Sequence, residues 1–298
     1  MSDDRTKNLE AALSFLENGQ NQKAMDIYFN LAEANPLDME ALHHLANLQN
    51  KLMMRTEAAD TFFRLGVALT QTEHQLRAIS AFNTVLRLEP ETIDANVQLA
   101  NHYLEMGMSE DARPHLEKLA AYHEGQGSTE ELINIYQRLV DIDPKNVATR
   151  IKLGEHYSTF QMTTEAATQF AAAGKELKLQ GRLDEYVMVM ERLVYHDQSR
   201  VDSILELANI YLQLGKPMKA LPKLRMAYEI APSNLDTLEM LAMAFTATGK
   251  GNKAILTYKA MVQIFTEQGA LDMVQRIYSQ ILAIDPDDEE ALRFMQGA

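Results

Sequence analysis

Apolar residues recur along this chain at intervals of three and four, and the same arrangement returns six times. Such spacing places the apolar side chains on one face of an α-helix, while a small residue at a fixed place lets two helices approach closely. Each repeat therefore predicts a helical hairpin at its start. One column of the alignment is alanine in all six repeats: Ala24, Ala58, Ala112, Ala166, Ala220 and Ala254.

The boundaries between repeats carry a phrase such as LVDIDPKN, in which a proline follows the end of an apolar run. Proline ends a helix, and a short polar side chain two residues later can cap the free N–H groups of the next helix. The boundary positions are Pro36, Pro90, Pro144, Gln198, Pro232 and Pro286, and the expected caps are Asp38, Thr92, Asn146, Asn234 and Asp288. These boundaries define repeats 3–36, 37–90, 91–144, 145–198, 199–232 and 233–286, with a C-terminal helix in 287–298.

Four of the repeats are 54 residues long and two are 34 residues long, and the extra segment reads as a third amphipathic helix. In the second repeat the middle helix also fits the first-helix pattern, with Gly66 followed by Ala78 and Phe82, so each long repeat is predicted to be two overlapping repeats. The expected turns are marked by Gly19, Gly107, Gly215 and Gly249 inside the hairpins, and by Gly127, Gly181 and Gly269 before the third helix.

The chain is thus predicted to be all-α, with sixteen helices and a short C-terminal helix in one helical-repeat solenoid over residues 1–298. An odd number of helices in a repeat leaves one question open. If helices alternate between two layers, the first helices of successive long repeats lie in opposite layers. The sequence does not decide which columns share a groove.

A unit with Leu-Ala or Leu-Gly, then Tyr or Phe, then Ala, then Phe or Tyr and finally Pro resembles the tetratricopeptide repeat. The segment ANIYLQLGKPMKALPKLRMAYEIAP is a close match to it, and six matches in register cover essentially the whole chain. The resemblance implies a right-handed superhelix. It also implies a non-enzymatic adaptor or scaffold that binds a peptide or a partner protein in a groove lined by the first helices.

Ligand contacts in this family usually come from first-helix positions turned away from the packed stripe, among them the residue after the Leu-Ala pair. In three repeats that column holds Asn47, Asn101 and Asn209, whose amides can both donate to and accept from a peptide backbone, and in the other three it holds Leu13, Glu155 and Met243. The neighbouring columns are acidic and contain Glu40, Asp94, Asp202, Glu206 and Asp236. The lysine and arginine clamp with which chaperone-binding members of the family grip a C-terminal carboxylate is missing. We therefore expect a basic or amphipathic partner.

The charge balance excludes some partners. The chain has 42 Asp and Glu against 28 Lys and Arg, a formal charge of −14, which repels nucleic acid and anionic lipid surfaces. Nowhere do eighteen apolar residues follow one another, so no membrane insertion is expected. With no cysteine the chain has neither a disulfide framework nor a thiolate metal site, which fits a cytoplasmic location.

No pattern predicts catalysis. The eight histidines are scattered without a familiar metal spacing, and the glycine stretches HEGQGS and TGKGNK lack the full phosphate-binding pattern. Repeats and terminal helix account for every segment, so we expect no catalytic residues, no metal and no cofactor.

Several alternatives remain open. The terminal segment EEALRFMQGA has apolar residues that no later repeat covers, which leaves a homodimer formed through that end as one alternative. The chain could instead be a regulatory subunit of a multiprotein complex of the secretion, motility or polarity type, or contain an unrecognised small-ligand site. The seventeen methionines fit either the core or an adaptable partner surface.

Overall fold

The computed structural model describes residues 2–297, and within that range every regular element is an α-helix. Seventeen helices lie in this range, which confirms the predicted sixteen helices and the short C-terminal helix. They form two compact parts, an N-terminal half that ends at Pro144 and a C-terminal half that begins at Lys145. The division falls at the predicted boundary between the third and fourth repeats; the single continuous solenoid stays a prediction.

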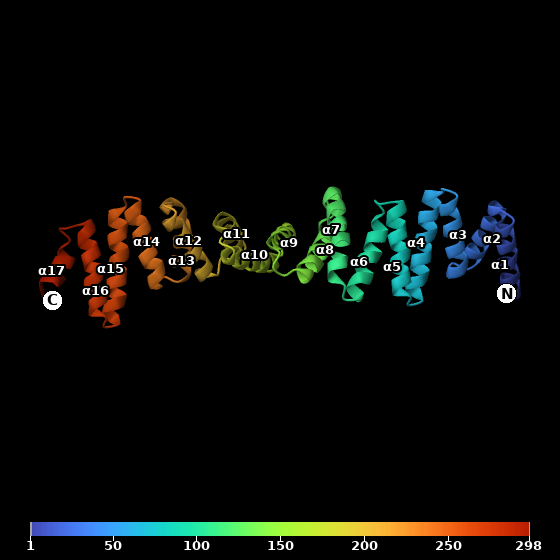
Figure 1. The fold of residues 1–298 in the computed structure, drawn as a ribbon. Helices are drawn as coiled ribbons and strands as arrows, with labels where there is room; N and C mark the ends of the chain where they lie inside the picture. The colour runs from blue at the N-terminus through green and yellow to red at the C-terminus, as the bar shows by residue number, and fades with distance from the viewer. Residues whose placement is uncertain (1, 298) are drawn as a thin grey trace. The chain divides into compact units, whose positions relative to one another are not determined.

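Within each half the helices follow one another as antiparallel neighbours (Figure 1). The N-terminal half contains α1 (Ser2–Glu17), α2 (Asn21–Ala34), α3 (Met39–Lys51), α4 (Arg55–Gln71), α5 (Gln75–Leu88), α6 (Ile93–Glu105), α7 (Ser109–Gln126) and α8 (Thr129–Ile142). The C-terminal half contains α9 (Val147–Thr159), α10 (Thr163–Leu179), α11 (Leu183–His196), α12 (Val201–Gln213), α13 (Pro217–Ile230), α14 (Leu235–Ala247), α15 (Gly251–Glu267), α16 (Leu271–Ile284) and α17 (Glu289–Gly297).

Helices in the N-terminal half alternate between two layers. The side chains of a helix contact those of the next helix but one, which shows that these two helices lie in the same layer. Arg5 of α1 forms an ion pair with Glu40 of α3 at 2.8 Å. In the other layer, Thr70 Oγ1 of α4 lies 2.9 Å from His102 Nε2 of α6. α1 and α3 therefore share one layer, and α4 and α6 share the other.

The C-terminal half alternates in the same way. Arg192 of α11 pairs with Glu155 of α9, and Lys178 of α10 pairs with Glu206 of α12. α12 also contacts α14 directly. α9 and α11 thus lie in one layer, and α10, α12 and α14 lie in the other.

The overlap predicted for the long repeats is confirmed in the second repeat by two matching contacts. A Cβ added to Gly154 would lie 2.9 Å from the ring of Phe170, which is the contact of a first helix with its second helix. A Cβ added to Gly66 on the middle helix α4 would lie 2.6 Å from the ring of Phe82 on α5. The same close approach joins the second and third helices of a long repeat, so α4 serves as second helix and again as first helix.

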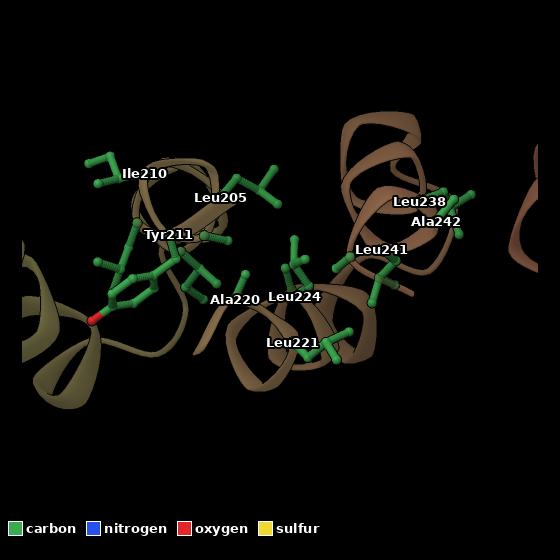
Figure 2. Packing of buried hydrophobic residues seen from close by; sticks show 14 of the residues in the cluster. Leu205, Ile210, Tyr211, Ala220, Leu221, Leu224, Leu238, Leu241 and Ala242 are labelled. Atoms are coloured by element: carbon green, nitrogen blue, oxygen red, sulfur yellow. The ribbon is translucent and has the colours of Figure 1, made fainter. Parts of the chain in front are cut away.

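The core confirms the alanine column. All six alanines are fully buried where second helices cross first helices, so no larger side chain fits between the axes. Figure 2 shows the equivalent packing in the C-terminal half, where Ala220 and Leu224 of α13 lie between α12 and α14 and Leu224 lies beside Leu241 of α14.

The turns confirm the glycine positions and extend them. All seven predicted glycines have a left-handed backbone, with φ between 66° and 72°. Three turns at the same repeat positions use other residues: Met53 (φ 63°), Glu73 (φ 61°) and Gln161 (φ 58°). The geometry is thus kept where glycine is missing, at a cost of about 1 to 2 kcal/mol for each non-glycine side chain.

The caps confirm the boundary prediction in four places. The side chains of Asp38, Asn146, Asn234 and Asp288 accept hydrogen bonds from the backbone N–H groups three residues later, at 2.8–3.1 Å. Thr92 is the exception, and its predicted cap is wrong. Its hydroxyl donates backwards to the carbonyl oxygen of Glu89 at 2.9 Å, so it is not turned toward the N–H groups of α6.

Proline is not required at a boundary. α11 ends at His196, two residues before Gln198, as the other helices end two residues before their prolines. The turn there is held by Asp197, whose carboxylate accepts from the backbone N–H and the hydroxyl of Ser199.

Candidate functional site

The two-layer arrangement separates the residues that sequence analysis groups by column. In the N-terminal half, Glu40 and Asn47 lie on α3, whereas Asp94 and Asn101 lie on α6 in the other layer. In the C-terminal half, Asp202, Glu206, Asn209 and Asp236 lie on α12 and α14, which share a layer. The structure therefore brings four of the eight predicted residues together on one surface.

Three of the four predicted residues in the N-terminal half are engaged in contacts within the fold. Glu40 pairs with Arg5, and Asn47 Nδ2 donates to the carbonyl oxygen of His43 at 2.9 Å. Asn101 Oδ1 accepts from Arg138 of α8 at 2.7 Å. Asp94 is exposed.

The surface of α12 and α14, which we call the acidic face, is built by helical periodicity. Asp202, Glu206 and Asn209 stand four and three residues apart on α12, which places them on one side of the helix. Leu207 and Ala208 are fully buried on the opposite side, against the neighbouring helices. The packing of the Leu-Ala pair thus turns the polar stripe outward.

The acidic face has a one-sided charge. α12 and α14 together contain four carboxylates and no lysine or arginine. The helices of the other layer beside them, α13 and α15, have five basic residues and two acidic ones. The acidic set is Asp202, Glu206, Asp236 and Glu239; the basic set is Lys219, Lys223, Arg225, Lys253 and Lys259. Opposite charges are therefore separated between the two layers.

Most of the acidic face is open to a partner. Asp202, Asp236 and Glu239 are exposed, and none of them forms an ion pair with another described residue. Glu206 is held on one side by Lys178 of α10. Burial, together with a hydrogen bond to Glu206, raises the pKa of Tyr186 above its ordinary value, so that phenol stays protonated at neutral pH.

Two residues beside the carboxylates add other kinds of contact. Asn209 is half-buried, and its amide makes no hydrogen bond with the described part of the chain. At the equivalent position of α14 stands Met243, which is 51% exposed. An unengaged amide and a flexible thioether next to carboxylates can meet both the backbone and the apolar stem of a basic segment.

Sequence analysis missed Glu239, because it lies one residue before the column that contains Glu206. The charge of each helix reveals it, since α12 and α14 contain no basic residue, whereas α13 between them contains three. The column alignment alone hides this signal.

The C-terminal end is partly covered. Phe294 of α17 is half-buried and packs against Tyr278 of α16, with ring centroids 4.8 Å apart. Leu292 is also half-buried, and Met295 is 37% exposed. The apolar surface left at this end is smaller than the sequence indicates.

Residues 2–297 also bear on metal binding and on membrane insertion. Within that range no three histidine, aspartate or glutamate side chains are placed to hold a metal ion. Nor is any described helix long and apolar enough to cross a membrane.

Comparison with known proteins gives one curated relative. No family model matches the chain. The CTR9 homolog of Arabidopsis thaliana is 23% identical over 227 residues, which cover 70% of this chain and 19% of that protein. The chain therefore spans about a fifth of the length of the relative it matches.

Solved structures of tetratricopeptide proteins also match at low identity. MamA is 15% identical, with 71% of this chain and 94% of that chain covered and a TM-score of 0.28. The TPR domain of P58(IPK) is 15% identical over 99% of both chains, with a TM-score of 0.28. YrrB, described as a TPR protein with an unusual peptide-binding site, is 18% identical over 71% of this chain and 96% of its own, with a TM-score of 0.24.

Proposed function

We propose that this chain, an all-α protein of tetratricopeptide-type helical repeats, is a non-enzymatic scaffold that binds a basic or amphipathic segment of a partner protein on the acidic face of α12 and α14. The observation that supports this most strongly is the separation of charge between α12 and α14 on one side and α13 and α15 on the other. A partner with lysines or arginines meets an unopposed negative field on that face.

Three of the four carboxylates, Asp202, Asp236 and Glu239, can act on a partner because no described residue forms an ion pair with them. Asp202 and Asp236 each stand in the first turn of their helix, where the helix dipole favours a negative charge. The helix dipole stabilises the charged form of these carboxylates, but their exposed oxygens can still bind a partner. An exposed ion pair between one of these carboxylates and a basic side chain of the partner contributes about 0.2 to 1 kcal/mol, so specificity needs several such contacts together.

Asn209 and Met243 supply the contacts that charge alone does not. An amide without a partner can donate to a peptide carbonyl and accept from a peptide N–H. Met243 offers an adaptable apolar contact for the methylene stem of a lysine or arginine. The face therefore suits a segment that alternates basic and apolar side chains, and a cytoplasmic setting remains part of this proposal.

Charge reversal tests the proposal. Asp202→Lys with Asp236→Lys is compared with Asp94→Lys and Glu117→Lys, two exposed acids of the N-terminal half that give the same change in net charge. Binding of labelled basic amphipathic peptides is followed by fluorescence anisotropy at low and high salt, and circular dichroism checks that helix content is unchanged.

The first pair should weaken binding about tenfold or more, and high salt should weaken wild-type binding in the same direction. The control pair should leave the affinity near that of the wild type. Equal losses for both pairs would show that only net charge matters, and the acidic face would then not be the site.

A further inference from the structure

A groove in the N-terminal half has a charge opposite to that of the acidic face. Its walls are α3 and α5, which lie in the same layer, and its floor is α4. The groove has a volume of about 290 Å³. It exists because the second repeat has three helices, so that its first and third helices stand side by side across the middle one.

Two arginines stand on the α5 wall. Arg77 and Arg87 are both exposed and line the groove, and neither forms an ion pair or hydrogen bond with another described residue. No carboxylate lines the groove, although acidic residues outnumber basic ones in the chain by 42 to 28. A groove with two open guanidinium groups and no acid is an anion-binding surface.

Between the two arginines the walls are polar and uncharged. Asn47 and Asn50 of α3 face Ser80 and Thr84 of α5. The Asn47 amide nitrogen is engaged with His43, which leaves its oxygen to accept a backbone N–H from a ligand. These groups suit an extended main chain.

The floor is apolar and the rim histidine is neutral. Phe62, Leu65 and Leu69 of α4 form the bottom of the groove and are themselves buried. Burial, with the nearby His44 and Arg77, lowers the pKa of His43, so the imidazole adds no charge at neutral pH. The positive charge of the groove therefore comes from the two arginines.

We propose that this groove binds an extended internal segment of an acidic partner protein, with one acidic side chain at Arg77 and a second at Arg87. Ten residues of helix separate the arginines, a rise of about 15 Å. An extended peptide covers that distance in about four to five residues. The groove therefore selects two glutamates or aspartates four positions apart, because side chains at that spacing point to the same side of an extended chain and can both reach the arginines, with an apolar side chain between them for the floor.

This surface is independent of the acidic face. It lies in the other half of the chain, its walls are a first and a third helix, and its charge is opposite. The net charge of −14 strongly repels the dense negative charge of a nucleic acid, whereas a segment with two acidic side chains matches the two arginines, so an acidic protein segment is the favoured ligand. A scaffold with both surfaces would join a basic partner to an acidic one.

The probe is an acetylated and amidated peptide with two glutamates four positions apart and a leucine between them, so that no terminal carboxylate can contribute. Companion peptides have both glutamates replaced by glutamine, or the two glutamates only two positions apart. The protein variants are Arg77→Gln with Arg87→Gln, and as a charge-matched control Arg55→Gln with Arg225→Gln, two exposed arginines outside the groove.

The wild type and the control variant should bind the widely spaced peptide, and the groove variant should bind it about tenfold more weakly. Both companion peptides should also bind more weakly, and reversal of Asp202 and Asp236 should leave this binding unchanged. Equal affinity of all three peptides, equal loss in both variants, or tighter binding of a single-stranded oligonucleotide at the same arginines would overturn the proposal.

Discussion

The 34-residue repeat over 199–232 and the 54-residue repeat over 37–90 use the same motif for different surfaces. In the short repeat, α12 is followed by one helix, so the next first helix, α14, falls in the same layer and the two form the acidic face. In the long repeat, α3 is followed by two helices, and its layer neighbour is the third helix α5. One additional helix in the repeat therefore changes the surface. Two first helices lie side by side in the short repeat, whereas a first and a third helix lie side by side in the long repeat.

The same exchange explains the contacts of the column that contains Asn47, Asn101 and Asn209. In two of the long repeats, Asn101 and Glu155 bond to Arg138 and Arg192 on the third helices, whereas Asn47 of the second repeat bonds to His43 on its own helix. In the short repeat, Asn209 has no third helix beside it and is left without such a contact. The position of a residue in the motif therefore predicts its contacts only when the number of helices in the repeat is also known.

The largest effect on stability is expected where a long repeat uses its middle helix twice. Gly66→Ala places a methyl group 2.6 Å from the ring of Phe82, which is fully buried, and should destabilise the N-terminal half by about 1 to 3 kcal/mol. Denaturant unfolding with hydrogen exchange, which reports the affected half, measures the change.

Two companion variants sharpen this test. Gly66→Ala with Phe82→Leu should recover part of the loss, since Ala208 and Leu224 make the equivalent contact in the short repeat. Gly125→Ala, a helical glycine with open space around it, should stabilise by up to about 1 kcal/mol. A neutral Gly66→Ala would contradict the double use of α4.

A smaller effect is expected at the helix caps. Asp38→Ala removes the cap of α3 and the partner of Arg5, at a cost of about 1 to 2 kcal/mol, whereas Thr92→Ala removes no cap bond and should cost only a few tenths. Thermal unfolding of the two variants decides. Equal losses would show that Thr92 caps α6 after all.

The Asp38 contact also predicts a pH dependence. The Arg5 guanidinium lowers the pKa of the Asp38 carboxyl in the folded state. A depressed pKa stabilises the fold above the pKa of the unfolded chain, and that contribution is lost as the pH falls through the folded value. The difference in melting temperature between wild type and Arg5→Gln should therefore be largest near neutral pH and shrink in acid. A constant difference would contradict this account.

The left-handed turns without glycine should respond in the opposite direction. Met53→Gly and Gln161→Gly should each stabilise by about 0.5 to 1 kcal/mol, because glycine adopts φ near +60° without strain. Met53 is 80% exposed, so little burial is lost. Gly107→Ala, at the same position of the third repeat, should destabilise, and chemical denaturation of all three gives the comparison. Destabilisation by the glycine variants would refute the strain.

The smallest effect is expected at the acidic face. Glu206→Gln removes an exposed ion pair with Lys178 and should change stability by less than about 0.5 kcal/mol. It should nevertheless weaken binding of a basic peptide, which anisotropy would measure. A large loss of stability would mean that Glu206 holds α10 to α12 and is not available to a partner.

The local features of this fold were readable from the sequence because each depends on neighbouring residues. The alanine column, the glycine turns and four of the five caps follow from helix spacing and capping chemistry. Thr92 was wrong because a hydroxyl can donate backwards as readily as it can accept forwards, and the sequence does not show which.

The surfaces were less predictable, since they depend on which helices share a layer. Asp202, Glu206, Asn209 and Asp236 share the acidic face, while Asp94 lies in the other half of the chain. Arg77 and Arg87 were not predicted, because the sequence does not show that the third helix of the second repeat forms the wall of a groove. The two arginines form part of a groove only because α3 lies beside α5.

Pairs of introduced cysteines test most directly which helices share a layer, and they can be used because the chain has no cysteine of its own. Asn101→Cys with Arg138→Cys joins α6 to α8 in one layer, and Asn47→Cys with Asn101→Cys pairs the same motif column across two layers. A short bismaleimide should cross-link the first pair within the folded monomer and leave the second pair unlinked. Ready linkage of Asn47→Cys to Asn101→Cys, with none for the first pair, would contradict the alternation on which both surfaces depend.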